Sequence, residues 1–471
     1  MSATSVQEPA QSLGFSSQEE EVRLAQLPLR GEVPGWLAGS LLRVGPAKFE
    51  VGEQRLRHWF DGLAMLHRFT IDAGVVSYGS RFLESHAYRA VKESGRLTYS
   101  EFATDPCRSI FKRVQALFTT EALSDNAGIN VARLGERFIA MTETPLPVEF
   151  DPETLASAAV RPYRPLGHLS TAHPHAGAES GSLLNYAAKL GPRSSYRFFE
   201  IPPQQGEPRL IASLPVREPA LMHSFGLSQR WLVLAEFPLL VNPLRLAFAN
   251  KPYIENYRWR PERGTRFTLI DRENGEVIGG FVSEACFAFH HVNSYEEGEA
   301  VVVDLCTYPD SGIVEDLYLD RLREGKPVPA AELTRFRLDI PGRTVSREQL
   351  CKGGLELPRI NYRDCNSRPY RYVWGNDLGP SGWVEQIVRV DLRDGSRRSW
   401  SESGAFPGEP VFVPRPGAAD EDDGVLLSIV LDSGRGASYL LVLDAADLRE
   451  LSRAIVPHHI PFSFHGQFVE S

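Results

Sequence analysis

Short apolar stretches that end in an acidic residue and a turn recur along this chain. Each is followed by a more polar stretch, and Asp, Asn and Gly are frequent at the turns. This pattern is typical of antiparallel hairpins, in which two short strands are joined by a tight turn. The pattern therefore predicts repeated small sheets. The clearest examples are residues 148–152, 267–271, 336–339, 387–391 and 441–444.

Long helical periodicity is scarce, and 39 glycines and 34 prolines divide the chain into many short segments. The spacing is too irregular for an array with a fixed period. A β-propeller with long inserted loops is the all-β architecture that best directs distant side chains to one axis. No linker divides the chain, so we predict a single domain over residues 22–471, with loops and short helices capping the active-site face. Residues 1–21, rich in Ser, Gln and Glu, are predicted to be a disordered tail.

Composition narrows the classes of partner and compartment. The net charge is −9 with acidic and basic residues interspersed, so no basic face is available to follow nucleic acid. Five scattered cysteines without a Cys-x-x-Cys pair are typical of free thiols in a reducing compartment. The N-terminus lacks a signal-peptide pattern. We therefore expect a cytoplasmic protein.

No apolar stretch reaches the eighteen or so residues that a membrane-spanning helix needs. Two segments, 109–118 and 242–257, mix large apolar side chains with cationic ones. Such segments can lie on a bilayer surface, which predicts possible peripheral contact with a membrane. They can equally be ordinary half-buried surface elements, and the sequence leaves both interpretations open.

Four of the twelve histidines lie in short apolar or aromatic settings and are candidate metal ligands: His173, His223, His290 and His465. Imidazole is the commonest protein ligand for transition metals. These histidines are 50, 67 and 175 residues apart, so only a closed, roughly radial fold can gather them. A lone histidine beside apolar residues is more often a hydrogen-bonded core residue. We interpret His58, His67, His86 and His168 in that way.

The motifs around these histidines resemble those of the carotenoid cleavage oxygenases. The resemblance extends from about residue 29 to 469, in the order found in that family. It rests on RVGP at 43–46, HWFDG at 58–62, TAHPH at 171–175, MHSFG at 222–226, FHHVN at 289–293 and FHG at 464–466. The resemblance implies a seven-bladed β-propeller that holds a non-haem Fe(II) on its axis through His173, His223, His290 and His465.

Three glutamates match the carboxylates that stand behind the iron ligands in that family: Glu143, Glu356 and Glu409. Each would accept a hydrogen bond from the remote ring N–H of a ligand and so fix its tautomer. Taken singly, each would be interpreted as a surface glutamate at a strand end. Residues His175, His291, His458 and His459 are left as non-ligands.

The resemblance implies an Fe(II)- and O2-dependent dioxygenase that splits one double bond of a carotenoid or apocarotenoid into aldehyde or ketone products. Four ligands on a metal that accepts six leave room for dioxygen and an apolar polyene. Similarity to the retinoid branch suggests Phe60, Phe102, Thr142 and Tyr308 as substrate-binding residues. Each of them can also be ordinary core.

Two other activities within the family remain as alternatives, and so does a binding function without catalysis. A retinoid-type isomerohydrolase would consume no oxygen, and residues 105–108 (DPCR) resemble one of its motifs. The stilbenoid-cleaving members carry a lysine where this chain has Thr142, which puts a phenolic substrate in doubt. A propeller that only binds a polyene or a partner protein should have lost a ligand or a glutamate, and none is lost.

Overall fold

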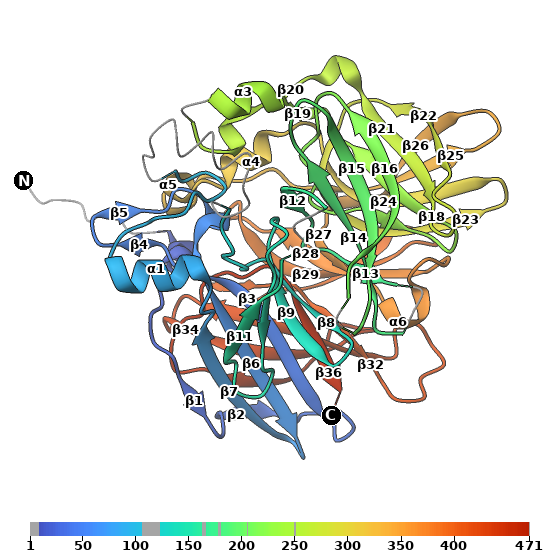
Figure 1. Cartoon of the computed structure of the whole chain (residues 1–471). Coiled ribbons are helices and arrows are strands. Elements are labelled where there is room, and N and C mark those ends of the chain that lie inside the picture. Colours follow the sequence, from blue (N-terminus) through green and yellow to red (C-terminus); the bar gives the residue numbers. More distant parts are fainter. Residues whose placement is uncertain are drawn as a thin grey trace, which may run out of the picture.

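The protein is a ring of seven antiparallel sheets, or blades, in a computed structural model that describes residues 9–105, 123–162, 166–177, 180–204, 206–248 and 251–470 (Figure 1). The predicted seven-bladed propeller is confirmed. Blade 1 contains β1 (Arg23–Leu24), β3 (Gly39–Lys48), β6 (Leu63–Asp72), β7 (Val75–Phe82) and β36 (Gly466–Glu470). Blade 2 contains β8 (Asn130–Leu134), β9 (Arg137–Met141), β10 (Val148–Phe150) and β11 (Ser157–Val160). Blade 3 contains β12 (Leu169–Ser170), β13 (His175–Ala176), β14 (Leu183–Lys189), β15 (Ser194–Ile201) and β16 (Arg209–Val216).

The remaining blades follow in chain order. Blade 4 contains β17 (Gly226–Leu227), β18 (Trp231–Glu236), β21 (Thr265–Asp271) and β22 (Val277–Ser283). Blade 5 contains β23 (Phe287–Glu297), β24 (Ala300–Tyr308), β25 (Glu332–Asp339) and β26 (Thr344–Gly354). Blade 6 contains β27 (Glu356–Arg359), β28 (Tyr372–Leu378), β29 (Val384–Asp391) and β30 (Ser396–Trp400). Blade 7 contains β2 (Leu29–Gly31), β31 (Ala405–Pro407), β32 (Val411–Pro414), β33 (Gly424–Asp432), β34 (Ala437–Asp444) and β35 (Glu450–Ile455).

Burial along the strands follows their position in the blade. Strand β24 lies second from the axis and is buried at every residue, because blades pack face to face. Its sequence, AVVVDLCTY, is accordingly an almost continuous apolar run. Strand β16 is the outermost of its blade and keeps several exposed positions. The innermost strands of neighbouring blades contact one another around the axis, as β17 does with β23 and β36 with β8.

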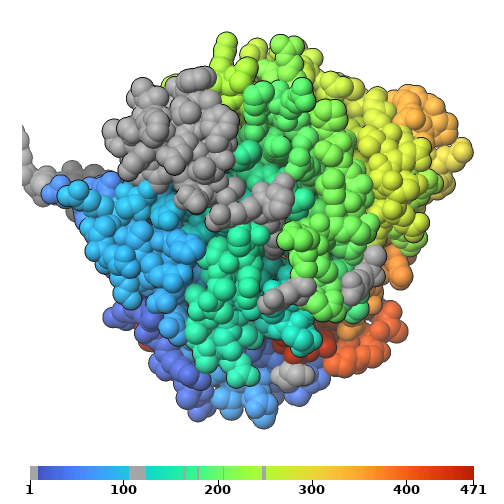
Figure 2. All heavy atoms as spheres, in the orientation of Figure 1, coloured from blue at the N-terminus to red at the C-terminus, as the bar shows by residue number. Residues whose placement is uncertain are grey.

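Both ends of the described chain take part in closing the ring. Strand β36 pairs with β3, with Gly466 opposite Arg43 and Glu470 opposite Gly39. Strand β2 adds to the C-terminal blade by pairing with β35. Figure 2 shows the red C-terminal end of the chain against the blue and teal residues of the first two blades. The propeller therefore closes through backbone hydrogen bonds between segments more than 400 residues apart.

Short helices and two small hairpins supply most of the structure between the blades. In Figure 1, α1, α3, α4 and α5 lie toward one side of the ring, and α6 lies apart from them. The hairpins are β4 (Glu50–Val51) with β5 (Gln54–Arg55), and β19 (Leu239–Val241) with β20 (Tyr257–Trp259). The helices are η1 (Ala10–Phe15), η2 (Trp59–Asp61), α1 (His86–Ser94), α3 (Pro243–Phe248), η4 (Ile254–Asn256), η5 (Pro261–Arg263), α4 (Gly312–Asp316), α5 (Leu319–Arg323) and α6 (Tyr362–Cys365). Across the described ranges, none of these helices has both the length and the apolar character needed to cross a bilayer.

The predicted disordered tail is wrong for residues 9–21. Helix η1 packs against the propeller, and the Phe15 side chain is fully buried. Its ring meets those of Trp59, Trp383 and Phe462 edge-on, with centroids 6.0, 5.1 and 5.1 Å apart. The segment was predicted to be disordered because of its polar composition, which gave too little weight to the single aromatic residue Phe15.

The histidines interpreted as core residues divide into two groups. His58 and His67 are buried and hydrogen-bonded, His58 to the Val314 carbonyl and His67 to the Tyr78 hydroxyl. His168 is half-buried and accepts a hydrogen bond from the Leu190 N–H. His86 is exposed and pairs with Asp125, so its interpretation as a core residue is wrong.

Replacing Phe15 by Ala should destabilise the protein by about 3–5 kcal/mol, because it opens a cavity among three aromatic rings. Urea unfolding followed by intrinsic fluorescence measures the change. Val75→Ala, at an exposed apolar position, is the control and should cost little. Equal stability of the Phe15 variant and the parent would mean that this segment does not anchor the fold.

Candidate metal centre

Four histidines from four blades meet at the propeller axis. His173 lies between β12 and β13, His223 precedes β17, His290 lies within β23 and His465 precedes β36. One ring nitrogen of each lies within 4.8 Å of those of the other three. The Nε2 atoms of His173 and His223 are 2.9 Å apart, and those of His290 and His465 are 3.1 Å apart. The structure therefore brings together all four candidate ligands.

Interruptions of the innermost strands direct these side chains toward the axis. Strands β12 and β13 both pair with β14, and His173 lies in the gap between them. The pairing of β23 with β24 shifts register on both sides of His291, which marks a β-bulge beside His290. Bulges re-aim side chains and are common next to functional sites. The local backbone thus departs from regular pairing where a ligand must turn inward.

Two motif glycines permit the close approach of strands at the axis. A Cβ atom on Gly466 would lie 2.4 Å from Cγ of Arg43 and 2.5 Å from the Leu42 carbonyl oxygen. A Cβ on Gly226 would lie 2.5 Å from Oγ of Ser294. Because the Leu42 carbonyl oxygen belongs to the backbone, only glycine can follow His465 directly in this packing, whereas a side chain at position 226 would require Ser294 to move.

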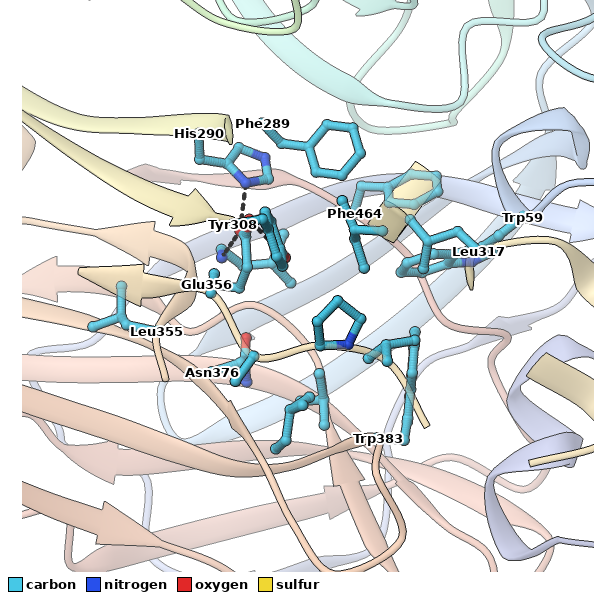
Figure 3. A pocket seen from close by; sticks show the side chains of 18 of the residues that line it. Trp59, Phe289, His290, Tyr308, Leu317, Leu355, Glu356, Asn376, Trp383 and Phe464 are labelled. Carbon is cyan, nitrogen blue, oxygen red and sulfur yellow. Dashed lines mark hydrogen bonds and ion pairs between the residues drawn. The ribbon is translucent and has the colours of Figure 1, made fainter. Parts of the chain in front are cut away.

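The three predicted glutamates stand behind three of the histidines. Oε1 of Glu143 is 2.6 Å from Nδ1 of His223, and Oε1 of Glu409 is 2.7 Å from Nδ1 of His465. Oε2 of Glu356 is 2.5 Å from Nδ1 of His290, as the dashed line in Figure 3 marks. An Nδ1–H that donates to a carboxylate leaves Nε2 with a lone pair directed at the axis.

Each blade contributes one residue to this group of seven. The histidines come from blades 3, 4, 5 and 1, and the glutamates come from blades 2, 6 and 7. Glu409 lies between β31 and β32, which both pair with β33, so it occupies the same kind of strand interruption as His173. The sevenfold ring thus supplies four ring nitrogens and three carboxylates to one centre.

Two arginines complete the charge balance around Glu409. Arg43 is fully buried, and its Nη1 lies 3.3 Å from Oε2 of Glu409 while its Nη2 donates to the Phe464 carbonyl. Arg359 donates to the same carboxylate at 2.8 Å. Burial alone would raise the pKa of Glu409, but Arg359, His465 and Arg43 more than offset this and hold the pKa well below its usual value.

Burial is the main influence on the pKa values of His465 and His173. It lowers the pKa of His465 to about 3, against the opposing effect of Glu409, and it lowers that of His173 well below its usual range. For Glu356, burial raises the pKa, yet His290, the Leu357 N–H and the Tyr308 hydroxyl together hold it below its ordinary value. Neutral histidines and ionised glutamates are the protonation states that a bound cation requires.

The donor set fits a metal ion. Nitrogen ligands at about 2.1 Å from a metal, in neighbouring positions at right angles, lie about 3.0 Å apart. The two Nε2 pairs at 2.9 and 3.1 Å have this separation. Without a cation between them, lone pairs at such distances repel. The three carboxylates and the two guanidinium groups together leave one negative charge, which would compensate part of the charge of a dication at the centre.

An apolar cavity of about 90 Å³ opens beside the histidines (Figure 3). Phe60 and Tyr308 line it, as predicted. Among the described residues, Phe102 and Thr142 do not line it; Phe102 packs against Phe60 with ring centroids 5.3 Å apart. The cavity can hold only part of a long polyene, so the rest of the molecule has to lie elsewhere. The aromatic wall contains Trp59, Phe60, Phe289, Tyr308, Trp383 and Phe464.

Several residues of the centre were not singled out from the sequence. Phe289 and Phe464 directly precede the candidate ligands His290 and His465, so their motifs already contained the signal. Arg43 lies in the RVGP motif, but nothing in a single sequence distinguishes a buried arginine from a surface one. Trp383 reaches the cavity from the β28–β29 connection, and no sequence pattern connects it to the histidines.

The remaining histidines near the axis have other partners. His175 bonds to the Phe225 carbonyl and the Tyr362 hydroxyl, and His291 bonds to Ser224. Within the described ranges, the candidate ligand group contains only the four predicted histidines.

The structure combines a closed propeller with four histidines on its axis and an apolar cavity beside them. Comparison with known proteins identifies the class of protein to which this arrangement belongs. The family described as RPE65, retinal pigment epithelial membrane protein, matches residues 15–470, so the chain belongs to this family. The predicted resemblance to carotenoid cleavage oxygenases is thereby confirmed.

Curated relatives cover almost the whole chain. A carotenoid isomerooxygenase of Galleria mellonella is 35% identical over 496 residues, which cover 96% of this chain and 95% of the relative. A beta,beta-carotene 15,15'-dioxygenase of Mus musculus is 33% identical over 516 residues, which cover 96% of this chain and 90% of the relative. A glutamate-to-glutamine variant of Synechocystis apocarotenoid oxygenase has a similar structure, with a TM-score of 0.88 at 26% identity. The match covers 98% of this chain and 99% of that one. A cobalt-substituted form of that Synechocystis enzyme matches with a TM-score of 0.87.

We predict that the purified protein retains close to one iron per chain and that His290→Ala abolishes retention, because one of four nitrogen ligands is lost. Glu409→Gln should weaken iron affinity roughly 10- to 100-fold, since the imidazole remains but loses its carboxylate partner. Elemental analysis after dialysis against a chelator measures both. His86→Ala removes an exposed histidine and should retain iron. Full retention in His290→Ala would refute the ligand assignment.

Proposed function

We propose that this protein is a non-haem iron(II) dioxygenase that splits one double bond of a carotenoid or apocarotenoid with O2, giving two aldehyde or ketone products. The observation that carries the proposal is the convergence of His173, His223, His290 and His465 beside an apolar cavity with aromatic walls. Relatives that are named carotenoid dioxygenases support the substrate class.

The side chains of the site suit a reaction that needs no proton donor. One C=C bond and one O2 molecule balance two C=O bonds, so the reaction takes up neither protons nor external electrons. Bound iron would supply the activation of dioxygen. Phe60, Phe289 and Phe464 would hold the alkene and exclude water. The Tyr308 hydroxyl already donates to Glu356, so its proton is engaged within the protein.

The three glutamates would maintain the iron site rather than contact the substrate. Glu143, Glu356 and Glu409 each accept an Nδ1–H, which fixes the ring orientation and keeps the Nε2 lone pair directed at the metal. His173 lacks such a carboxylate partner among its described contacts, and Thr171 Oγ1 instead accepts a hydrogen bond from its backbone N–H.

An aromatic series suggests the route by which the substrate reaches the iron. Phe60 lies 6.5 Å from His223 between ring centroids, Phe102 lies 5.3 Å beyond it, and Tyr253 lies 6.2 Å beyond Phe102. This series leads from the centre toward η4. We propose that Phe102, with Thr142 beside Glu143, contributes to the wall of the entry tunnel.

We also propose that the protein works in the cytoplasm and takes its polyene from a membrane surface. Leu244 on α3 is 58% exposed and adjoins the exposed Arg245. Tyr257 is buried and Tyr253 faces Phe102, so segment 242–257 offers fewer apolar contacts than its sequence suggested. Segment 109–118 lies outside the described residues. The four described cysteines are free and buried, which fits a reducing compartment.

Incubating the iron-loaded protein with a panel of polyenes should consume one O2 per molecule cleaved and give two carbonyl products. Oxygen-electrode uptake and product masses measure this, and 18O2 should label both products. An isomerised product of unchanged carbon number, formed without oxygen uptake, would instead support the isomerohydrolase. Cleavage of stilbenes alone would support a stilbenoid-cleaving dioxygenase. Binding without any product would contradict an enzymatic role.

Replacing Leu244 by Ser should reduce flotation of the protein with liposomes and slow turnover of membrane-dissolved substrate. Turnover of detergent-dissolved substrate should persist, because Leu244 does not line the cavity. Val277→Ser is the matched control: it removes an exposed apolar side chain on β22 in blade 4. Equal flotation of the Leu244 variant and the parent would exclude α3 as the contact surface.

A further inference from the structure

One polar atom at the edge of the apolar cavity lacks a hydrogen-bond donor. Asn376 lies on β28 opposite Glu356, lines the cavity and is 1% exposed. Its Nδ2 donates to three main-chain carbonyls, those of Gln386, Pro407 and Gly408, at 3.3, 3.5 and 3.2 Å. Its Oδ1 is buried and, within the part of the chain that the structure describes, has no partner.

The orientation of this amide is fixed by its surroundings. Exchanging the amide nitrogen and oxygen of Asn376 would place Oδ1 against three carbonyl oxygens, none of which can donate. Figure 3 shows the oxygen of Asn376 directed toward the side of the cavity where Glu356 and His290 lie, with the nitrogen directed the opposite way. The free acceptor therefore lies on the cavity side of the amide, but it is itself buried, so a ligand reaches it only when neighbouring side chains move.

The neighbouring acceptors at this end of the cavity already have donors. Asp377 accepts from the Gly354 and Leu378 N–H groups and from Arg397. Glu356 accepts from His290, the Leu357 N–H and the Tyr308 hydroxyl. Of the three described side chains that carry acceptor oxygens at this end of the cavity, Asn376, Asp377 and Glu356, only Asn376 thus gains a first partner when a ligand brings a donor.

An unpaired buried acceptor discriminates between ligand ends. A hydroxyl that donates to Oδ1 of Asn376 removes the cost of leaving that atom unpaired. An aldehyde, ketone or hydrocarbon end brings no donor, so the free-energy cost of the unpaired Oδ1 remains. Polar sites reject analogues that lack a hydroxyl in this way. Leu355 and Leu378 also line this end, and small rotations of such side chains are ordinary when a ligand enters.

We infer that Asn376 selects a polyene whose buried end carries a hydroxyl group. The inference rests on the proposed function, since it takes the cavity as the polyene site, and it adds the polarity of the substrate end that lies there. Asn376 is in this view a specificity-determining residue rather than a catalytic one.

Binding of two matched polyenes tests the inference. The probes are two apocarotenals that are identical except for a hydroxyl on the end ring, titrated into iron-loaded protein under nitrogen, where no turnover occurs. Trp59 and Trp383 line the cavity, so quenching of tryptophan fluorescence reports occupancy. The hydroxylated probe should bind roughly tenfold more tightly to the parent protein, and Asn376→Leu should bring the ratio of the two dissociation constants close to one.

The ratio within each variant is independent of how much of the protein is folded. Asn361→Leu is the matched control, because Asn361 is also a buried amide with an unpartnered Oδ1 but does not line the cavity; its ratio should stay near ten. Equal affinities in the parent, or a preference that survives in Asn376→Leu, would overturn the inference. Equal affinities with cleavage of both probes in air would leave the proposed function intact, whereas no quenching by either probe would contradict both.

Discussion

Closure of the ring between β3 and β36 is the constraint on which the rest of this structure depends. The same strand pair also completes the metal centre, because His465 directly precedes β36 and Arg43 of β3 lies opposite Gly466. The Arg43 guanidinium then bonds to Glu409 of blade 7 and to the Phe464 carbonyl. A fault in closure therefore removes a candidate ligand and disturbs the charge balance in one step.

The seven-blade plan also explains how costly groups are buried together. Each blade delivers one histidine or glutamate to the axis, so no single sheet has to bury more than one of them. Carboxylate–imidazole hydrogen bonds and the two arginines distribute the charge, while the apolar wall begins immediately beside the histidines. Charged groups and an apolar cavity can lie side by side because the carboxylates contact the Nδ1 atoms of the histidine rings, behind the centre.

Sequence patterns predicted the architecture and the four candidate ligands well, and they failed where three-dimensional context decides. Short strands and turn residues indicate a propeller, and the motifs identify His173 and its three partners. Phe15 was missed because its segment is polar in composition, and His86 was assigned to the core although it lies on the surface. Gly375-Asn376-Asp377 has the composition of a turn, yet it lies within β28 because packing against β27 and β29 overrides local preference. No one-dimensional pattern reports that a buried amide oxygen has no donor.

The position of β36 has a consequence for how the protein is made. A ribosome synthesises β36 after the other described strands, so blades 2 to 6 can pair their own strands while blade 1 still lacks its innermost strand. Until residues 464–470 have left the exit tunnel, one ring nitrogen is missing and Glu409 faces Arg359 without its histidine. Until β36 has formed, the nascent chain therefore offers only an incomplete set of histidines and glutamates at the axis.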